Sequence, residues 1–333
     1  MTITPELRPW PEVAGEADWG VLLLGNGASQ AVWREFSYPS LFQVARTRNR
    51  NNPLQPEDEA LFRALGNTRN FEGVLAGLDV SRRVMGALGI EMQKVEERYE
   101  SIRAALVEAV HLVHVPWRLI DEEVLRAVRA ALLEYEYVFS TNYDLVVYWS
   151  MMVGEGSRFR DFFWGGPFDS SDTEVWGKAT KVLYLHGGLH LYRSWNGSTF
   201  KDRAAPFENL LDRFGTLQNS TPLFISEGTA DEKQNAIRRS DYLSFALQRF
   251  STRKAPLVVF GHGLGDSDSH LVDAVNRHRG RRIAYSVLPG SDADIIQRKA
   301  AVTGRFPEAE ITFFDATTHP LGSDELRVSP PQE

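Results

Sequence analysis

The stretch VLLLGNGASQAVW, residues 21–33, decides the fold expected of this chain. Its four leading apolar residues run into a short segment made of Gly25, Asn26, Gly27, Ala28 and Ser29. Such a segment can be a plain turn, because glycine admits backbone conformations closed to other residues and lets a helix pack close to a strand. It can also be a phosphate cradle, in which backbone N–H groups and the positive end of the next helix hold an anion.

Short apolar segments recur along the chain after this first one. They predict buried strands at residues 21–24, 137–140, 182–185, 223–225, 257–260, 283–287 and 311–314. Segments of helical periodicity lie between them, and Asp121 and Ser291 are typical residues for the start of a helix. Since strands that alternate with helices form parallel sheets, we expect an α/β fold: a Rossmann-like, mainly parallel sheet with helices on both faces.

The spacing of these strands is uneven. Residues 25–136 separate the first strand from the second, a longer interval than any later one, and residues 35–135 have a mostly helical pattern. The sequence therefore predicts an inserted helical subdomain at 35–135. Residues 1–34 and 136–333 would form the Rossmann-type domain around it.

Composition excludes several classes of site. Cysteine is absent from the 333 residues, so disulfides, Cys-based zinc sites, thiolate catalysis and iron–sulfur clusters are ruled out. The net charge of −7 argues against a broad basic surface for nucleic acid. Residues 1–20 do not resemble a secretory signal, and no apolar run approaches the ~20 residues that span a bilayer. We expect a cytoplasmic protein that binds neither membranes nor nucleic acid.

Four of the predicted strands are followed by an unusual polar or glycine-rich segment. These segments are residues 25–29, 141–144, 186–188 and 261–269. In an open parallel sheet the carboxyl ends of the strands meet at one edge, where ligands bind in a crevice. We therefore expect the segments to bring an anion cradle, an amide, a carboxylate and an imidazole to one cleft.

Each segment also has an interpretation without function. Asn142 and Asp144 can bond to backbone groups of their own turn. His186 and His190 have the i, i+4 spacing of metal ligands on a helix, but the glycines between them and the strand before them argue against a helix, so no metal is expected. One residue of the last segment can cap the helix after it: Asp266, Ser267 or Asp268.

The first three segments resemble motifs of sirtuins and SIR2-like proteins. Residues 25–29, Gly-Asn-Gly-Ala-Ser, are similar to the Gly-Ala-Gly-x-Ser loop of that family. Residues 141–144, Thr-Asn-Tyr-Asp, are similar to its Thr-Gln-Asn-x-Asp segment, with one residue fewer before the asparagine. His186 and Gly187 match the His-Gly that carries the sirtuin histidine.

The later part of the chain extends this resemblance. The segment that begins at Gly261 looks like the late Gly-x-Ser-x-x-Asp loop of bacterial SIR2-like proteins, which closes over the adenosine end of NAD. Residues 222–247 further resemble SIR2-like proteins of the DUF4917 type. The helical region before Tyr137 carries no recognisable motif.

Two departures from sirtuins decide which activity the resemblance implies. Sirtuin deacylases hold a small module together with four cysteines around zinc, whereas this chain has none, and their glutamine before the asparagine is missing here. The resemblance therefore implies a SIR2-like NAD hydrolase, which cleaves NAD to nicotinamide and ADP-ribose. Several such hydrolases are bacterial anti-phage effectors that deplete NAD. Control by a protein partner or by a homo-oligomer would suit a toxic activity of this kind.

The resemblance also assigns roles to residues. Asn142 would bond to the ribose and the attacking water, Asp144 would hold the carboxamide or lend negative charge, and His186, with an ordinary pKa near ~6.5, would accept a proton. The residues expected to bind NAD are Gly25, Asn26, Gly27, Ala28, Ser29, Thr141, Tyr143, Gly261, His262, Gly263, Asp266, Asp268 and His270.

Two rival functions share these features. A dehydrogenase would need G-x-G-x-x-G and an acidic residue about 20 positions later, but the sixth position here is Gln30, which disfavours hydride transfer. A non-catalytic sensor would bind NAD or ADP-ribose in the same loops to regulate a partner. Mere binding does not require Asn142, Asp144 and His186 together, so the three residues favour catalysis.

Overall fold

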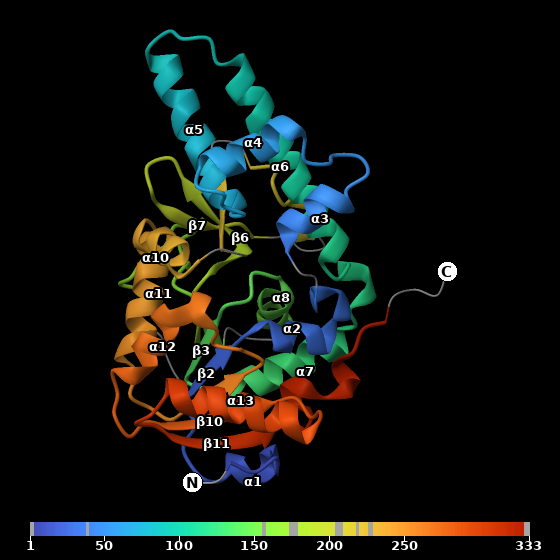
Figure 1. Cartoon of the computed structure of the whole chain (residues 1–333), viewed down its shortest axis with the longest axis vertical. Helices are drawn as coiled ribbons and strands as arrows, with labels where there is room; N and C mark the ends of the chain where they lie inside the picture. Colours follow the sequence, from blue (N-terminus) through green and yellow to red (C-terminus); the bar gives the residue numbers. More distant parts are fainter. Residues whose placement is uncertain are drawn as a thin grey trace.

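The computed structural model describes residues 3–37, 40–154, 158–172, 179–203, 209–217, 220–225 and 229–329. These residues form a large sheet, a small sheet and the helices around them (Figure 1). Two long helices project from the end of the molecule that is uppermost in Figure 1.

In the described part of the chain the large sheet has eight strands, and its neighbouring strands run parallel. From edge to edge their order is β1-β11-β10-β9-β2-β3-β5-β4. Their bounds are β1 Arg8–Pro9, β2 Val21–Leu24, β3 Tyr137–Ser140, β4 Phe159–Arg160, β5 Thr180–Tyr184, β9 Leu257–Phe260, β10 Arg282–Val287 and β11 Glu310–Asp315.

The six central strands follow the doubly wound order of Rossmann folds. Numbered along the chain from β2, they read 3-2-1-4-5-6. The predicted mainly parallel α/β sheet is thereby confirmed. The chain moves from β2 toward β3 and β5, and the second half starts again at β9 on the other side of β2. This puts the switch point, where such folds bind ligands, between the carboxyl ends of β2 and β9.

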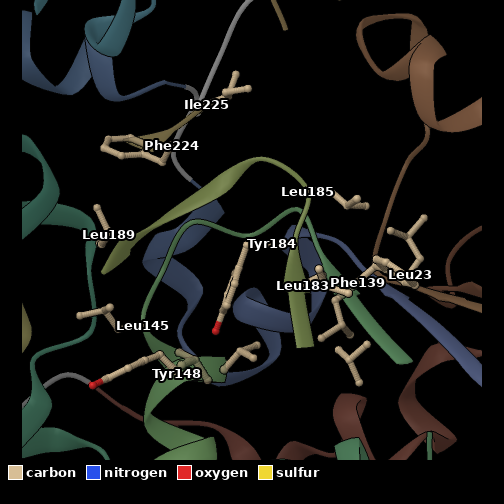
Figure 2. Packing of buried hydrophobic residues seen from close by; sticks show 14 of the residues in the cluster. Leu23, Phe139, Leu145, Tyr148, Leu183, Tyr184, Leu185, Leu189, Phe224 and Ile225 are labelled. Carbon is tan, nitrogen blue, oxygen red and sulfur yellow. The ribbon is translucent and has the colours of Figure 1, made fainter. Parts of the chain in front are cut away.

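The central strands are buried on both faces. Every residue of β2, β3 and β9 is buried. Leu23, Phe139 and Leu183 are register partners on β2, β3 and β5, and Figure 2 shows their side chains close together. An uninterrupted apolar run is what a parallel strand needs when helices cover both of its faces.

Helices cover the two faces of this sheet. In Figure 1, α11 and α12 stack on one side, whereas α7 and α8 contact each other on the other. As predicted, α7 and α13 begin directly after Asp121 and Ser291. The bounds of the helices that accompany the large sheet are α1 Trp10–Ala14, α2 Asn26–Val32, α7 Glu122–Leu133, α8 Val146–Met152, α10 Ala230–Arg238, α11 Asp241–Thr252, α12 Ser269–Asn276 and α13 Asp292–Arg305.

The interval between β2 and β3 is helical in the described residues. It holds η1 Arg34–Ser37, α3 Leu41–Thr47, α4 Pro56–Ala64, α5 Phe71–Ala87, α6 Gln93–Val113, η2 Trp117–Leu119 and α7. The long helices α5 and α6 pack against each other and form the projection in Figure 1. Within the described residues, no helix has the length and apolar character needed to cross a membrane. The subdomain boundaries at 35 and 135 remain a prediction.

The small sheet is antiparallel and was not predicted. It consists of β6 Gly187–Ser194, β7 Thr199–Lys201 and β8 Ser220–Phe224, in the order β7-β6-β8. The strand predicted at 223–225 lies here and not in the large sheet. The reason is that β6 turns back two residues after β5 and pairs with β8, with Gly187 opposite Phe224. The remaining short elements are α9 Leu210–Arg213, η3 Asp266–Asp268, η4 Ala316–Thr318, η5 Pro320–Gly322 and η6 Asp324–Leu326.

Candidate functional site

Two adjoining cavities open at the carboxyl edge of the large sheet, at the switch point. The first has a volume of about 730 Å³ and lies over the ends of β9 and β10 and against α13. The second has a volume of about 330 Å³ and lies over the end of β3. Both are lined by the same four residues, which form the junction between them: Asn26, Gly261, His262 and Gly263.

The junction exists because the glycine segments after β2 and β9 touch. The N–H of Gly25 donates to the carbonyl of Phe260 at 2.9 Å, and that of Gly27 donates to the carbonyl of Gly261 at 2.8 Å. A Cβ on Gly27 would lie 2.7 Å from the Cα of Gly261, so no larger residue fits without movement of the backbone. Gly261 has a φ of +65°, a conformation that glycine adopts without strain.

The segment after β2 is therefore less open than the predicted cradle. Helix α2 begins at Asn26, so Gly27, Ala28 and Ser29 lie in its first turn. The N–H of Ala28 donates to the carbonyl of Gly25 at 3.0 Å, so the N–H groups of Gly25, Gly27 and Ala28 all have partners inside the protein. An anion at this place would have to be held by other groups of the junction.

A buried hydrogen-bond network joins the segments after β2 and β3. The Oγ of Ser29 donates to Oδ2 of Asp144 at 2.5 Å. The Nδ2 of Asn142 donates to Oγ of Ser29 at 2.8 Å and to the carbonyl of Gly25 at 3.0 Å. Since a backbone carbonyl can only accept, the amide orientation of Asn142 is fixed, and both of its N–H donors are used.

Asn142 therefore offers a ligand only its carbonyl oxygen. This Oδ1 is buried and has no hydrogen-bond partner among the described residues, although Asn142 lines the second cavity. A buried polar atom without a partner is rare and costs free energy. An acceptor in this state suits a hydroxyl group or a water molecule that donates to it.

Asp144 is held by the protein on both of its oxygens. Its Oδ1 accepts from the N–H of Val146 at 2.8 Å, and its Oδ2 accepts from Ser29. Burial raises the pKa of this carboxyl, while the hydrogen bonds from Ser29 and Val146 oppose that rise. Asp144 lines the second cavity, so its carboxyl group lies close to anything bound there.

Three further side chains line the second cavity, and a fourth lies behind one of them. The Nε2 atoms of His186 and His270 lie 3.0 Å apart, which requires one of them to donate to the other. Oδ1 of Asp268 lies 4.0 Å from Nε2 of His186 and accepts from Nζ of Lys233 at 2.7 Å. His186, Asp268 and Lys233 line the cavity, and His270 lies outside its lining.

These imidazoles are neutral at physiological pH. Burial holds the pKa of His186 well below its usual value, and the positive charge of Lys233 adds to that effect. Burial also lowers the pKa of His270 to about 4, against the opposing charge of Asp268. A neutral imidazole is the form that can accept a proton.

The same group could hold a metal ion. One donor atom each from His186, His270 and Asp268 lies within 4.8 Å of the other two. Two imidazoles and a carboxylate suit zinc or another transition metal. The ammonium group of Lys233 already neutralises Asp268, so metal binding would have to displace it from the carboxylate.

The other predicted residues lie as follows. Thr141 bonds through its N–H and Oγ1 to the carbonyl of Leu24, both at 3.0 Å. His262 accepts at Nδ1 from the N–H of Leu264 at 2.9 Å, and burial lowers its pKa to about 4. The predicted residues that line the second cavity are Asn26, Thr141, Asn142, Tyr143, Asp144, His186, Gly261, His262, Gly263 and Asp268.

Six predicted residues line neither the second cavity nor the junction. Gly27 lines the first cavity only. Ser29 and His270 lie behind Asp144 and His186, and Gly25 and Ala28 hold the glycine segment together. Asp266 differs most from its expected place, because its side chain is 98% exposed and pairs with Arg305 at 3.0 Å. The helix cap expected in this segment falls at Asp268, whose carboxylate bonds to Lys233 instead of to the helix.

Sequence reasoning missed Lys233 and the arginines of the first cavity. Lys233 lies on α10 in a run of polar residues, DEKQ, which is typical of a solvated helix face. Its side chain is nevertheless buried against Asp268. The first cavity is lined by Arg34, Arg298, Arg305 and Arg327, which come from both ends of the chain and carry no local motif.

Comparison with known proteins gives one family and several distant structures. The model of the family described as "Domain of unknown function (DUF4917)" matches residues 22–321. No curated protein matches the chain. A Sir2 homolog–NAD complex aligns at 15% identity over 93% of this chain and 88% of that chain, with a TM-score of 0.39. A mutant of Sir2 homologues in complex with 2'-O-acetyl ADP ribose aligns at 14% identity over 95% and 92%, with a TM-score of 0.38. At these scores, neither structure supports a statement about the activity of this chain.

Proposed function

The chain belongs to the DUF4917 family, and we propose that it is a cytoplasmic NAD glycohydrolase that cleaves NAD to nicotinamide and ADP-ribose. The observation that supports this proposal is the composition of the second cavity. An amide oxygen without a partner, a buried carboxylate and a neutral imidazole line one cavity at the switch point of a doubly wound sheet. The motif likeness to SIR2-like NAD hydrolases supports the same choice of substrate.

The reaction needs little acid catalysis. The bond between ribose C1′ and the nicotinamide nitrogen breaks with its electron pair moving to the positively charged ring, so nicotinamide leaves neutral. A water oxygen then bonds to C1′ and gives up a proton. The enzyme must stabilise the positive charge that develops on the ribose and must place the water.

Each lining residue has a part in this proposal. Oδ1 of Asn142 accepts a hydrogen bond from the water or from a ribose hydroxyl. The carboxylate of Asp144 stabilises the cationic ribose electrostatically. His186, with its Nε2–H donated to His270, accepts the proton of the water at Nδ1, and Asp268 then offsets the charge on the imidazolium.

The two cavities together suit a dinucleotide. Their volumes of about 330 and 730 Å³ lie in the range of small-molecule sites, and they meet at a shared junction. With the reacting nicotinamide ribose in the second cavity, the diphosphate would lie at the junction beside Asn26 and Gly263. The adenosine would then lie in the first cavity.

One observation favours a second candidate, a non-catalytic sensor of NAD or ADP-ribose. Both N–H donors of Asn142 and both oxygens of Asp144 are bonded within the protein. Residues held in this way can stabilise the loops without taking part in a reaction. A sensor would bind the same ligands and release no nicotinamide.

Product analysis tests the hydrolase proposal. Purified protein incubated with NAD and acetyl-lysine peptides should release nicotinamide and ADP-ribose at a rate that does not depend on the peptide. Formation of O-acetyl-ADP-ribose in step with nicotinamide would indicate a deacylase instead. Treatment with a chelator should leave the rate unchanged, because no step of this proposal uses a metal.

The proposed cellular role is defence against phage by depletion of NAD. The motif likeness to SIR2-like effectors supports it. A protein partner or self-association would keep such an activity in check. Infection of cells that carry the chain, with NAD measured over time, tests this role.

A further inference from the structure

The first cavity carries an unusual amount of positive charge. Arg34, Arg298, Arg305 and Arg327 line it together with one described carboxylate, that of Asp324, and none of the four arginines lines the second cavity or the junction. The chain as a whole has a net charge of −7, so this cluster of arginines differs from the chain's overall charge. In the binding mode proposed above, with the diphosphate at the junction, these arginines would lie beside the adenosine end of the ligand.

Two of the arginines have no acidic partner among the described residues, namely Arg34 and Arg298. The other two are paired with exposed carboxylates: Arg305 with Asp266 at 3.0 Å, and Arg327 with Asp324 at 2.7 Å. Ion pairs this exposed are worth little and exchange readily with a stronger anion. Arg34 and Arg298 are therefore available to a phosphate, whereas Arg305 and Arg327 would have to exchange their exposed carboxylate partners for it.

Four residues on one face of helix α13 line the first cavity. Arg298, Ala301, Val302 and Arg305 stand at positions i, i+3, i+4 and i+7, so they share one face of the helix, and all of them line the cavity. The two arginines thus flank a small apolar floor. Val287 and Leu288, at the end of β10, add apolar surface to the same cavity.

An apolar floor with guanidinium groups at its ends fits a phosphorylated nucleoside. The aromatic base would lie on the aliphatic surface. A phosphate ester on its ribose would be bound by the fork of N–H donors that guanidinium offers to phosphate oxygens. In dinucleotide-binding folds, arginine beside the adenosine ribose accommodates a 2′-phosphate, whereas an acidic residue bonds to a free 2′-hydroxyl.

We propose that the first cavity binds an adenosine ribose that carries a 2′-phosphate, so that the substrate class of this protein includes NADP. This inference rests on the proposed function for the placement of the adenosine. It adds a preference for a 2′-phosphate on the ligand, which the residues of the second cavity do not determine.

Calorimetric titration tests the preference for a 2′-phosphate, because it measures binding and does not require the protein to turn over a substrate. The probes are ADP-ribose 2′-phosphate and ADP-ribose, with 2′,5′-ADP, 3′,5′-ADP and 5′-AMP as shorter analogues. We expect the 2′-phosphate to improve affinity by about tenfold or more over the unphosphorylated ligand, as a charge-assisted bidentate contact allows. The gain should shrink as salt is raised. It should largely disappear in the double variant Arg34→Gln/Arg298→Gln, whose affinity for ADP-ribose should change much less.

A matched control removes an arginine outside the cavity. Arg279→Gln alters an exposed residue paired with Glu308 and should keep the full preference. ADP-ribose binding without any gain from the 2′-phosphate would overturn the preference and leave the proposed function standing. An equal gain from a 3′-phosphate would overturn the assignment to a 2′-ester. Failure of every probe to bind the wild-type protein would contradict both the preference and the proposed function.

Discussion

The Nε2 atoms of His186 and His270 lie 3.0 Å apart, with only His186 lining the second cavity. His270 can accept the Nε2–H of His186 and so fix the tautomer whose Nδ1 is free to take a proton. It is a positioning residue in this account, and His186 is the base.

Replacement of the two histidines should therefore have unequal effects. His186→Ala should lower kcat by roughly 10² or more, the usual contribution of a general base. His270→Ala should lower kcat less and leave KM for NAD close to wild type. His270→Gln should recover part of the loss, because its amide oxygen can accept the same N–H. Equal losses in His270→Ala and His270→Gln, or a change confined to KM, would contradict the positioning role.

Asn142→Ala should abolish NAD cleavage and also weaken the fold. The variant loses two buried hydrogen bonds that join the segments after β2 and β3, which costs roughly 1–3 kcal/mol of unfolding free energy. Ser29→Ala is the comparison variant, because it breaks the same network at a residue that lines neither main cavity, while also removing one of the two hydrogen bonds that hold Asp144. Chemical denaturation and nicotinamide release should show similar instability in both variants and a much larger loss of turnover in Asn142→Ala. Equal loss of turnover would make Asn142 a structural residue.

Substitutions at two glycines distinguish a residue that borders the bound ligand from a residue that is needed for packing of the loop. Gly263 lines both cavities, and a Cβ placed on it meets nothing within 4 Å, so Gly263→Val should fold normally and bind NAD weakly. Gly27→Val should instead unfold more easily, because its side chain collides with the backbone of Gly261. Gly165→Val, at another glycine with open space, serves as the control. Normal NAD affinity in folded Gly263→Val would show that the ligand lies elsewhere.

Stability should fall as the pH drops from 7.5 to 5.5. Burial lowers the pKa values of His114, His262 and His270 to about 4, whereas the same side chains titrate near ~6.5 in the unfolded chain. Between these values the unfolded chain binds protons that the folded chain does not, so stability is full above pH ~6.5 and declines below it. Each of the three histidines should lower the free energy of unfolding by about 1 kcal/mol at pH 5.5.

Urea unfolding at pH 7.5, 6.5 and 5.5 measures this decline. His114→Gln should flatten it, since His114 is a buried imidazole that accepts at Nε2 from the N–H of Leu145 at 3.0 Å. An unfolding free energy that stays constant over this range would contradict the assignment of neutral buried imidazoles.

The strands and their common edge could be predicted from the sequence. The predicted bounds of three strands, 21–24, 137–140 and 257–260, are those of β2, β3 and β9. A short continuous apolar run between polar residues is typical of a buried strand, so its ends can be located in the sequence. The convergence of Asn142, Asp144 and His186 on one cavity followed from the rule for parallel sheets.

What could not be predicted depends on partners distant in the sequence. Apolarity identified a strand at 223–225 but could not say that it pairs with β6 in a separate sheet. The local sequence around Gly27 predicts a cradle, whereas the contact that determines its packing is with Gly261, more than 200 positions away in the chain. The burial of Lys233 could not be predicted for the same reason, since it depends on the ion pair with Asp268, 35 positions later in the chain.

The central claim is tested most directly by mass spectrometry of NAD, nicotinamide and ADP-ribose in cells that express the wild-type chain or Asn142→Ala. The account predicts that NAD falls while nicotinamide and ADP-ribose rise with the wild-type chain. With equal amounts of soluble Asn142→Ala, the three metabolites should stay at the level of cells without the chain. Equal loss of NAD with both chains would contradict the role of Asn142. Unchanged NAD with the wild-type chain, including after phage infection, would contradict the hydrolase itself.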